Sequence, residues 1–126
     1  MASDTFAVYF DFGSALLNKK ARSEVSALAE TLKAKGDNLT GVRVVGFADR
    51  VGSAAANEKL SKRRADAVRN FLFSNGVKNA KVLETRWFGD SVTTTLCPKG
   101  MPKAALIKCL QPDRRVEIEI DYMTGK

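Results

Sequence analysis

The chain has 126 residues, of which 44% are hydrophobic and 28% charged, a composition that suits one globular domain with a buried core. Its 21 basic residues outnumber its 14 acidic ones, and the net charge of +7 favours an anionic partner, such as a nucleic acid or a polyanionic polymer. Because the chain has no histidine, the commonest catalytic base and most zinc sites are excluded, and no apolar run reaches the roughly 18 residues of a membrane span.

Several segments show the periodicity of secondary structure. Strands are predicted where aromatic and β-branched residues cluster, or where apolar and polar residues alternate. Helices are predicted where apolar residues recur at spacings of three and four, with a capping residue or a glycine at their ends. In chain order, the predicted elements are a strand over 5–12, a helix over 18–35, a strand over 42–47, a helix from about 53 to 75, a strand over 81–88, a short helix over 103–110 and a strand over 114–122.

This order predicts an α/β fold, more narrowly an α+β two-layer sandwich in which a mixed sheet carries both long helices on one face. The chain contains no internal repeat, low-complexity segment or linker, so residues 1–126 are expected to form a single domain. The buried side of the second long helix is predicted from its apolar residues, which are Leu60, Ala67, Val68, Phe71 and Leu72.

A lone acid lies at the end of the second predicted strand, and a lone arginine lies deep in the long helix that follows. Asp49 follows the second predicted strand, where α/β layers tend to bind ligands. Arg64 lies seven residues after Asn57, so the two share a helix face, with Ser53 and Ser61 nearby. Asp49 could hold an ammonium group and Arg64 a carboxylate, which together would bind a zwitterionic amino acid. The alternative is a structural salt bridge between strand and helix.

Cys97 and Cys109 are the two cysteines of the chain. Without histidine partners they are too few for a zinc site, so no metal is expected. They could form a disulfide, which implies an oxidising compartment, or they could be two separate buried thiols.

Ordered motifs of the chain match one family pattern. GFAD ends at Asp49, where the family has a strand ending in G-x-T-D, and NEKLSKRRADAV over 57–68 fits N-x-x-L-S-x-x-R-A-x-x-V. YFDFGSALL, PDRRVEIEI and the cysteine-bracketed CPKGMPKAALIKC add to the match. Over about residues 6–122 the chain thus resembles the OmpA-like family of peptidoglycan-binding domains. It departs from the pattern at Ala48, where threonine is usual, and in lacking an Asn-Pro after the third strand.

The resemblance implies non-covalent binding of peptidoglycan through the diaminopimelate residue of the stem peptide, which would anchor the outer membrane or an envelope complex to the cell wall. Asp49 then takes the ammonium group and Arg64 the carboxylate of diaminopimelate, and Asn57 lines the site. It also implies a periplasmic location, within a membrane-attached parent protein of a Gram-negative bacterium, a disulfide between the two cysteines and no cofactor.

Four further residues match family positions near the ligand. Asp11 and Gly13 correspond to the mouth of the opening strand. Arg114 and Arg115 correspond to the family's paired arginines, and either could reach the ligand or brace Asp49.

Two other classes of function are disfavoured by the sequence. The basic residues are scattered, without an aromatic ladder or a glycine-rich phosphate loop, which argues against nucleic-acid binding. Glu117 and Glu119 could suggest a cell-wall hydrolase, but Asp121 continues the same alternation, as on a solvated sheet face. Without histidine no common nucleophile-base pair exists, so the chain is expected not to be an enzyme.

Overall fold

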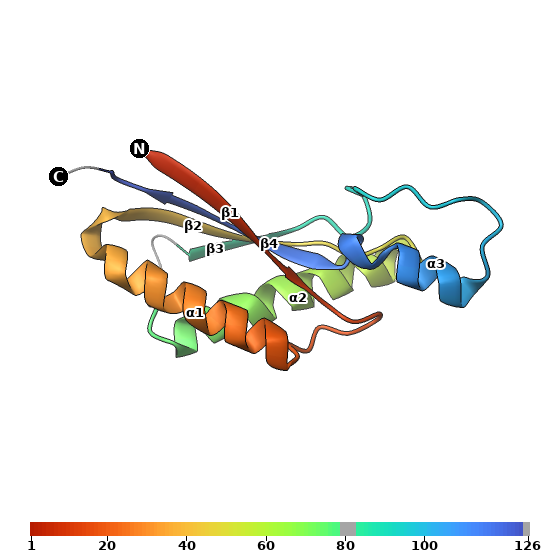
Figure 1. Ribbon diagram of the computed structural model, residues 1–126, viewed down its shortest axis with the longest axis horizontal. Helices are drawn as coiled ribbons and strands as arrows, with labels where there is room; N and C mark the ends of the chain where they lie inside the picture. Colours follow the sequence, from red (N-terminus) through yellow and green to blue (C-terminus); the bar gives the residue numbers. More distant parts are fainter. Residues whose placement is uncertain (79–82, 125–126) are drawn as a thin grey trace.

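The computed structural model describes residues 1–78 and 83–124. Within them the chain folds into a four-stranded sheet with two long helices and short helical turns (Figure 1). In chain order, the elements are β1 Ala2–Tyr9, α1 Lys19–Lys35, the 3-10 turn η1 Gly36–Asn38, β2 Leu39–Gly46, α2 Ala54–Ser74, β3 Leu83–Trp87, α3 Lys103–Cys109, the 3-10 turn η2 Gln111–Asp113 and β4 Arg115–Tyr122.

The strand order in the sheet is β1-β4-β2-β3. β4 pairs antiparallel with β1 and β2, whereas β2 and β3 are parallel. Figure 1 shows α1 and α2 on the same face of this mixed sheet, so the predicted two-layer α+β fold is confirmed. None of the helices in the described part of the chain combines the length and apolar character needed to cross a bilayer.

Strand pairing sets the ends of the strands. The predicted first strand, 5–12, is wrong at both ends, because β1 runs from Ala2 to Tyr9, over the length that faces β4. β2 likewise begins at Leu39 rather than at residue 42. The third strand is confirmed from residue 83, and residues 81–82 of that prediction lie outside the described residues.

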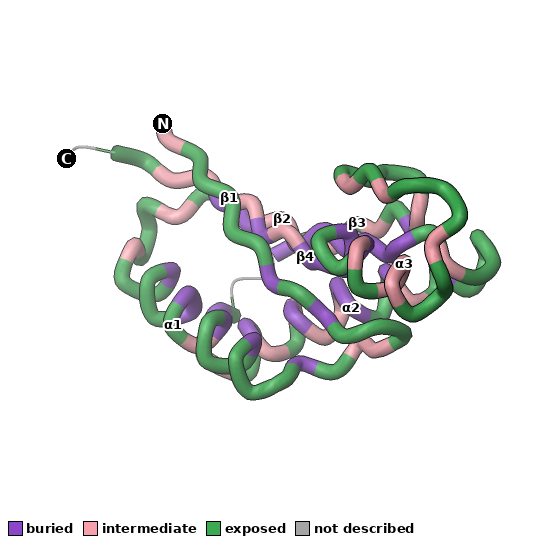
Figure 2. Tube along the Cα trace, turned by 45° about the vertical axis from the view of Figure 1, so that its right-hand side comes forward, coloured by how far each residue is buried: buried purple, intermediate pink, exposed green. Residues whose placement is uncertain are grey.

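The core lies between the helices and the sheet, and Figure 2 shows the buried segments of both elements. The inner strand β4 contributes Val116, Ile118 and Ile120 to this core, and each of them is at most 1% exposed. Asn18 caps α1 by accepting a hydrogen bond from the Ala21 amide, and Ser53 caps α2 in the same way, as the capping rules predict.

The predicted buried side of α2 is wrong in part. Leu60, Ala67 and Phe71 are only partly buried, and the residues that are buried along α2 are Asn57, Ser61, Arg64, Ala65, Val68 and Leu72. The helix is thus rotated about its axis relative to the prediction. The close approach of the β2 and α2 backbones explains this rotation, because a Cβ atom on Gly46 would lie 2.0 Å from the carbonyl oxygen of Ser61. The polar residues Asn57, Ser61 and Arg64 of α2 are therefore directed at the sheet, near the carboxyl end of β2.

The other face of the sheet carries ion pairs. Arg43 donates to Glu119 at 3.0 Å and to Asp121 at 2.8 Å, and Arg115 donates to Glu117 at 2.7 Å. Every one of these carboxylates has an arginine partner and is partly exposed, as expected for a solvated sheet face rather than a pair of catalytic acids.

Candidate functional site

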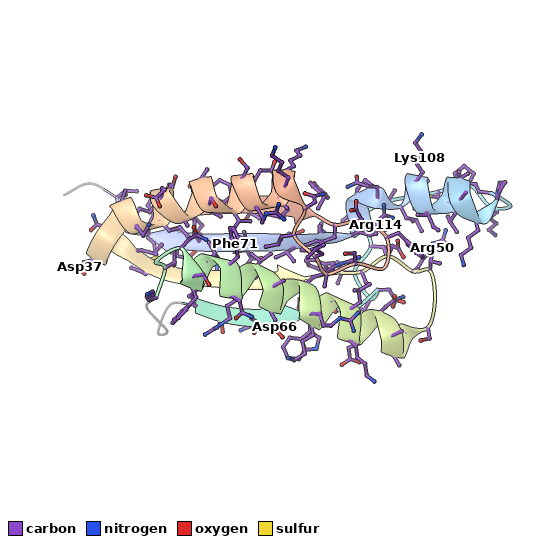
Figure 3. All side chains as sticks on the ribbon, turned by 90° about the horizontal axis from the view of Figure 1, so that it is seen from below. Asp37, Arg50, Asp66, Phe71, Lys108 and Arg114 are labelled. Carbon is purple, nitrogen blue, oxygen red and sulfur yellow. A yellow bond between two sulfur atoms is a disulfide. The ribbon has the colours of Figure 1, made fainter. Side chains whose placement is uncertain are left out.

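The candidate site lies where β1, β2 and β3 end and α1 and α2 begin. Figure 3 shows Arg50 and Arg114 together at this end of the molecule, near α3, while Asp37 lies at the opposite end. Helix starts expose backbone amides and strand ends expose turning loops, so polar ligands are commonly bound at such a place.

Asp49 is held in a fixed position just beyond β2. Its carboxylate is 4% exposed, and Oδ1 accepts a hydrogen bond from the Val51 amide at 3.0 Å. Oδ2 accepts one from Nη1 of Arg114 at 3.1 Å, which makes a buried salt bridge. Each oxygen keeps a further lone pair that a ligand's ammonium group can use.

Arg114 joins three parts of the fold at Asp49. Its Nε donates to the carbonyl of Phe10 at 3.1 Å, and its Nη1 donates to the carbonyl of Ile107 at 2.7 Å as well as to Asp49. The sequence left open whether Arg114 or Arg115 braces Asp49, and in the structure it is Arg114. Arg115 points to the opposite face of the sheet, where its guanidinium lies 3.8 Å from the Phe47 ring centroid.

Arg64 is fully buried on α2, and its guanidinium is hydrogen-bonded to three backbone carbonyls. Nε donates to Ser14 at 2.8 Å, Nη1 to Phe47 at 3.0 Å and Nη2 to Asp11 at 3.1 Å. Burial lowers the pKa of Arg64 to about 10, and the negative charge of nearby Asp49 opposes that shift.

The alternative of a direct salt bridge between Asp49 and Arg64 is wrong for the described structure, because the ion-pair partner of Asp49 is Arg114. Arg64 has five N–H groups, and three of them are used by carbonyls. The two side chains therefore place opposite charges close together without neutralising each other by direct contact.

Asp11 and Gly13 form the turn that covers Arg64. The Asp11 carbonyl accepts from Arg64, while its side chain is exposed. Gly13 has a φ of 68°, a conformation that favours glycine, and a Cβ there would meet no atom within 4 Å. The loop between β1 and α1 can therefore turn sharply over the guanidinium.

Asn57 lies on the same face of α2 as Arg64, as predicted, and this face is buried; its side chain contacts loops rather than Arg64. Its Nδ2 donates to the Val51 carbonyl at 3.2 Å and to Oδ2 of Asp90 at 2.9 Å. Asp90 was missed by the sequence analysis. Its position three residues past the end of β3 matches that of Asp49 past β2, because Gly46 and Trp87 pair in the parallel register.

The segment between the two cysteines is fixed at two points. Cys97 and Cys109 form the predicted disulfide. The buried carboxylate of Asp113, also missed, accepts from the Thr94 amide at 2.8 Å, the Thr94 hydroxyl at 2.9 Å and the Thr95 hydroxyl at 3.1 Å. The cystine loop thus holds α3, whose Ile107 carbonyl orients Arg114.

Comparisons with known proteins agree on one family. The sequence profile of the OmpA family matches residues 9–106. Outer membrane protein A of Yersinia pseudotuberculosis serotype I is 43% identical over 115 residues, which are 90% of this chain and 32% of that protein. The first curated relatives are longer proteins, of which the chain spans between 32% and 48%.

Solved structures share the fold. The peptidoglycan-associated lipoprotein from Burkholderia pseudomallei superimposes with a TM-score of 0.75 at 25% identity, covering 91% of this chain and 89% of that one. The OmpA-like domain of FopA1 from Francisella tularensis subsp. tularensis gives a TM-score of 0.73 at 22% identity, covering 97% of this chain and 77% of that one.

Proposed function

The chain belongs to the OmpA family, and from this premise and the geometry of its site we propose that it binds peptidoglycan non-covalently, through the diaminopimelate residue of the stem peptide. By this contact it anchors an outer-membrane or envelope protein to the cell wall in the periplasm of a Gram-negative bacterium. The names of two similar proteins, a peptidoglycan-associated lipoprotein and outer membrane protein A, support this assignment.

The observation that carries the proposal is the pair of buried, opposite charges at the end of the sheet. Diaminopimelate has a free ammonium group and a free carboxylate on one side-chain carbon. Asp49 accepts from the ammonium group, and Arg64 donates to the carboxylate. Both protein groups are already shielded from water, at 4% and 0% exposed, so charged hydrogen bonds to them are stronger than bonds at the surface.

Binding at Arg64 requires a local rearrangement. The carbonyls of Asp11 and Ser14 occupy its Nη2 and Nε, so the ligand carboxylate replaces them as the loop after β1 moves outward. Gly13 is the residue in this loop that accommodates a change of backbone angles most readily. Ala48, where the family has threonine, contributes no hydroxyl to the ligand.

The test measures binding of a soluble diaminopimelate-type muropeptide and of a lysine-type one, which lacks the side-chain carboxylate. The wild-type chain is expected to bind only the first with measurable affinity. Asp49→Asn and Arg64→Lys should each weaken binding about tenfold to a hundredfold, since each removes a charged hydrogen bond or its bidentate geometry.

Two matched controls exist on the same chain. Arg63→Lys changes the neighbouring, exposed arginine, and Asp66→Asn changes a partly exposed aspartate of α2 that is paired with Lys62. Both controls should keep wild-type affinity. Equal affinity for the two muropeptides, or full binding by folded Asp49→Asn, would contradict the proposal.

A further inference from the structure

The two oxygens of the Asp49 carboxylate are held by different parts of the chain. Arg114 donates to Oδ2, whereas the backbone amide of Val51 donates to Oδ1 at 3.0 Å. The second bond closes a tight turn between β2 and α2, of the kind that an aspartate side chain makes with the amide two residues later. The orientation of Oδ1 therefore depends on where the backbone of Val51 lies.

Asn57 of α2 fixes this backbone from the other side. Its Nδ2 donates to the Val51 carbonyl at 3.2 Å, and that carbonyl has no other partner among the described residues. The second hydrogen of Nδ2 goes to Oδ2 of Asp90 at 2.9 Å. An amide nitrogen has two hydrogens to donate, so both are used and the rotation of the Asn57 amide is set.

Asp90 lies beside Asp49 on a firmly held piece of backbone. The amide of Gly89 donates to the buried Ser61 hydroxyl at 2.9 Å, and the carbonyl of Gly89 accepts from the Ala48 amide at 2.8 Å. These bonds tie the end of β3 to α2 and to the end of β2. Within the described chain, no lysine or arginine lies at ion-pair distance from Asp90, so no cation competes for its carboxylate.

The contacts form one continuous series of hydrogen bonds from β3 to the candidate site. At its start the acceptor is a half-buried carboxylate, and a hydrogen bond to a charged acceptor is stronger than one between neutral groups. Without Asp90 the amide of Asn57 is free to rotate, and the turn at Val51 loses its fixed donor. The Asp49 carboxylate would then be held at Oδ2 alone, by Arg114.

We propose that Asp90 is a positioning residue of the ammonium site: through Asn57 and Val51 it holds the Asp49 carboxylate in the orientation that accepts from the ligand. The inference rests on the proposed function, in which Asp49 binds the ammonium group of diaminopimelate. Binding groups need such support from the residues behind them, because a misdirected acceptor loses its hydrogen-bond geometry. Asn57 then acts on the ligand through the turn.

Two variants of Asp90 distinguish the hydrogen bond from the charge. Asp90→Asn removes the charge but keeps an oxygen that accepts from Asn57, whereas Asp90→Ala removes the acceptor. Each variant is titrated with two soluble muropeptides. One contains diaminopimelate, and in the other a hydrogen atom replaces the side-chain ammonium group.

The wild-type chain is expected to bind the ammonium-containing muropeptide more tightly. Asp90→Ala should weaken that binding about three- to tenfold and leave the affinity for the second muropeptide unchanged, because only the first uses Asp49. Asp90→Asn should stay within about twofold of the wild type for both. Asn57→Ala should match Asp90→Ala, and the double variant should lose no more than either single one, since both belong to one series.

Glu84→Ala is the control, because it removes a carboxylate from the same strand, where its side chain is 52% exposed and paired with Arg86. It should keep wild-type affinity for both muropeptides. The thermal midpoint of every variant is measured alongside, so that affinities are compared between folded proteins.

The outcomes separate this inference from the proposed function. Unchanged affinity of Asp90→Ala for the ammonium-containing muropeptide overturns the positioning role and leaves the diaminopimelate site intact. An equal loss for both muropeptides overturns it too, as does Asp90→Asn binding as weakly as Asp90→Ala. If the wild-type chain binds neither muropeptide, or both equally, the proposed function fails at Asp49 and the positioning role falls with it.

Discussion

At the scale of single residues, two neighbouring arginines make different contacts: Arg114 precedes β4, and Arg115 is its first residue. Arg114 contacts Asp49 at 3.1 Å and lies at the candidate site, whereas Arg115 binds Glu117 at 2.7 Å on the opposite sheet face. Arg114 donates to Asp49 and to the backbone carbonyls of Phe10 and Ile107. We therefore expect its role to be to position the carboxylate of Asp49, the proposed acceptor of the ligand's ammonium group.

Substitution of each arginine separates these tasks. Arg114→Gln leaves Asp49 buried without its ionic partner and should lower the free energy of unfolding by about 3 kcal/mol or more. It should also weaken muropeptide binding, because Asp49 is no longer oriented. Arg115→Gln should reduce stability by about 1–3 kcal/mol and leave affinity unchanged. Urea unfolding and titration calorimetry of both variants test this, and equal affinities for the two would contradict it.

At the scale of elements, the cystine loop is linked to the candidate site. α3 has no buried residue of its own, so its place depends on the disulfide between Cys97 and Cys109 and on the contacts of Asp113. Since the Ile107 carbonyl of α3 orients Arg114, the loop acts on Asp49 through a single side chain.

The double variant Cys97→Ser, Cys109→Ser tests this link. Loss of the cross-link should lower stability by about 3 kcal/mol, as expected for a loop of this length in the chain-entropy model. It should also reduce muropeptide affinity, since α3 is held less firmly. The thermal midpoint and the dissociation constant are measured on the same preparation, with the chemically reduced wild type as a second sample. Unchanged affinity despite a lower midpoint would show that the loop serves stability alone.

The ion pairs between β2 and β4 predict that the free energy of unfolding depends on pH. A hydrogen bond from Arg43, and secondly one from Ser3, holds the pKa of Asp121 below its usual value. The unfolded chain then takes up the proton at a higher pH than the folded one. The stabilisation is therefore complete above about pH 4 and is lost as the pH falls below that range.

Arg43→Met should reduce this acid sensitivity. The wild type is expected to lose more stability than the variant between about pH 7 and pH 3, because the hydrogen bond from Arg43, the larger cause of the lowered Asp121 pKa, is present only in the wild type. Urea midpoints at both pH values measure the difference. Lys62→Met, which removes an exposed ion pair with Asp66, is the control and should behave as the wild type. Identical pH dependence of wild type and Arg43→Met would contradict the assignment.

At the scale of the whole molecule, we expect the net charge of +7 to add a second, non-specific attraction to the proposed partner, an anionic cell wall. Exposed charges are screened beyond about 8 Å at physiological salt, whereas contacts with buried Asp49 and Arg64 are screened less. Binding to whole sacculi should therefore weaken more steeply with salt than binding to a small muropeptide. Pelleting assays and calorimetry over the same salt series give the two slopes, and equal slopes would count against this division.

The sequence by itself determined the features that depend on neighbouring residues. Asn18 and Ser53 cap helices because a side chain and the amides of the next turn lie within a few residues of each other. The order of strands and helices, and hence the two-layer fold, follows from apolar periodicity in the same local way. The motif around Asp49 and Arg64 identified the family, although the ligand contacts of both residues remain predictions.

Only the tertiary structure decided which distant residues meet. The contact of Gly46 with Ser61 turned the polar stripe of α2 inward, and the register of β4 with β1 shifted the first strand three residues toward the N-terminus, from 5–12 to 2–9. Whether Arg114 or Arg115 braces Asp49 depends on which face of the sheet each one points to, because adjacent residues at a strand start diverge. Such contacts join segments far apart in sequence, and no periodicity within either segment specifies its partner.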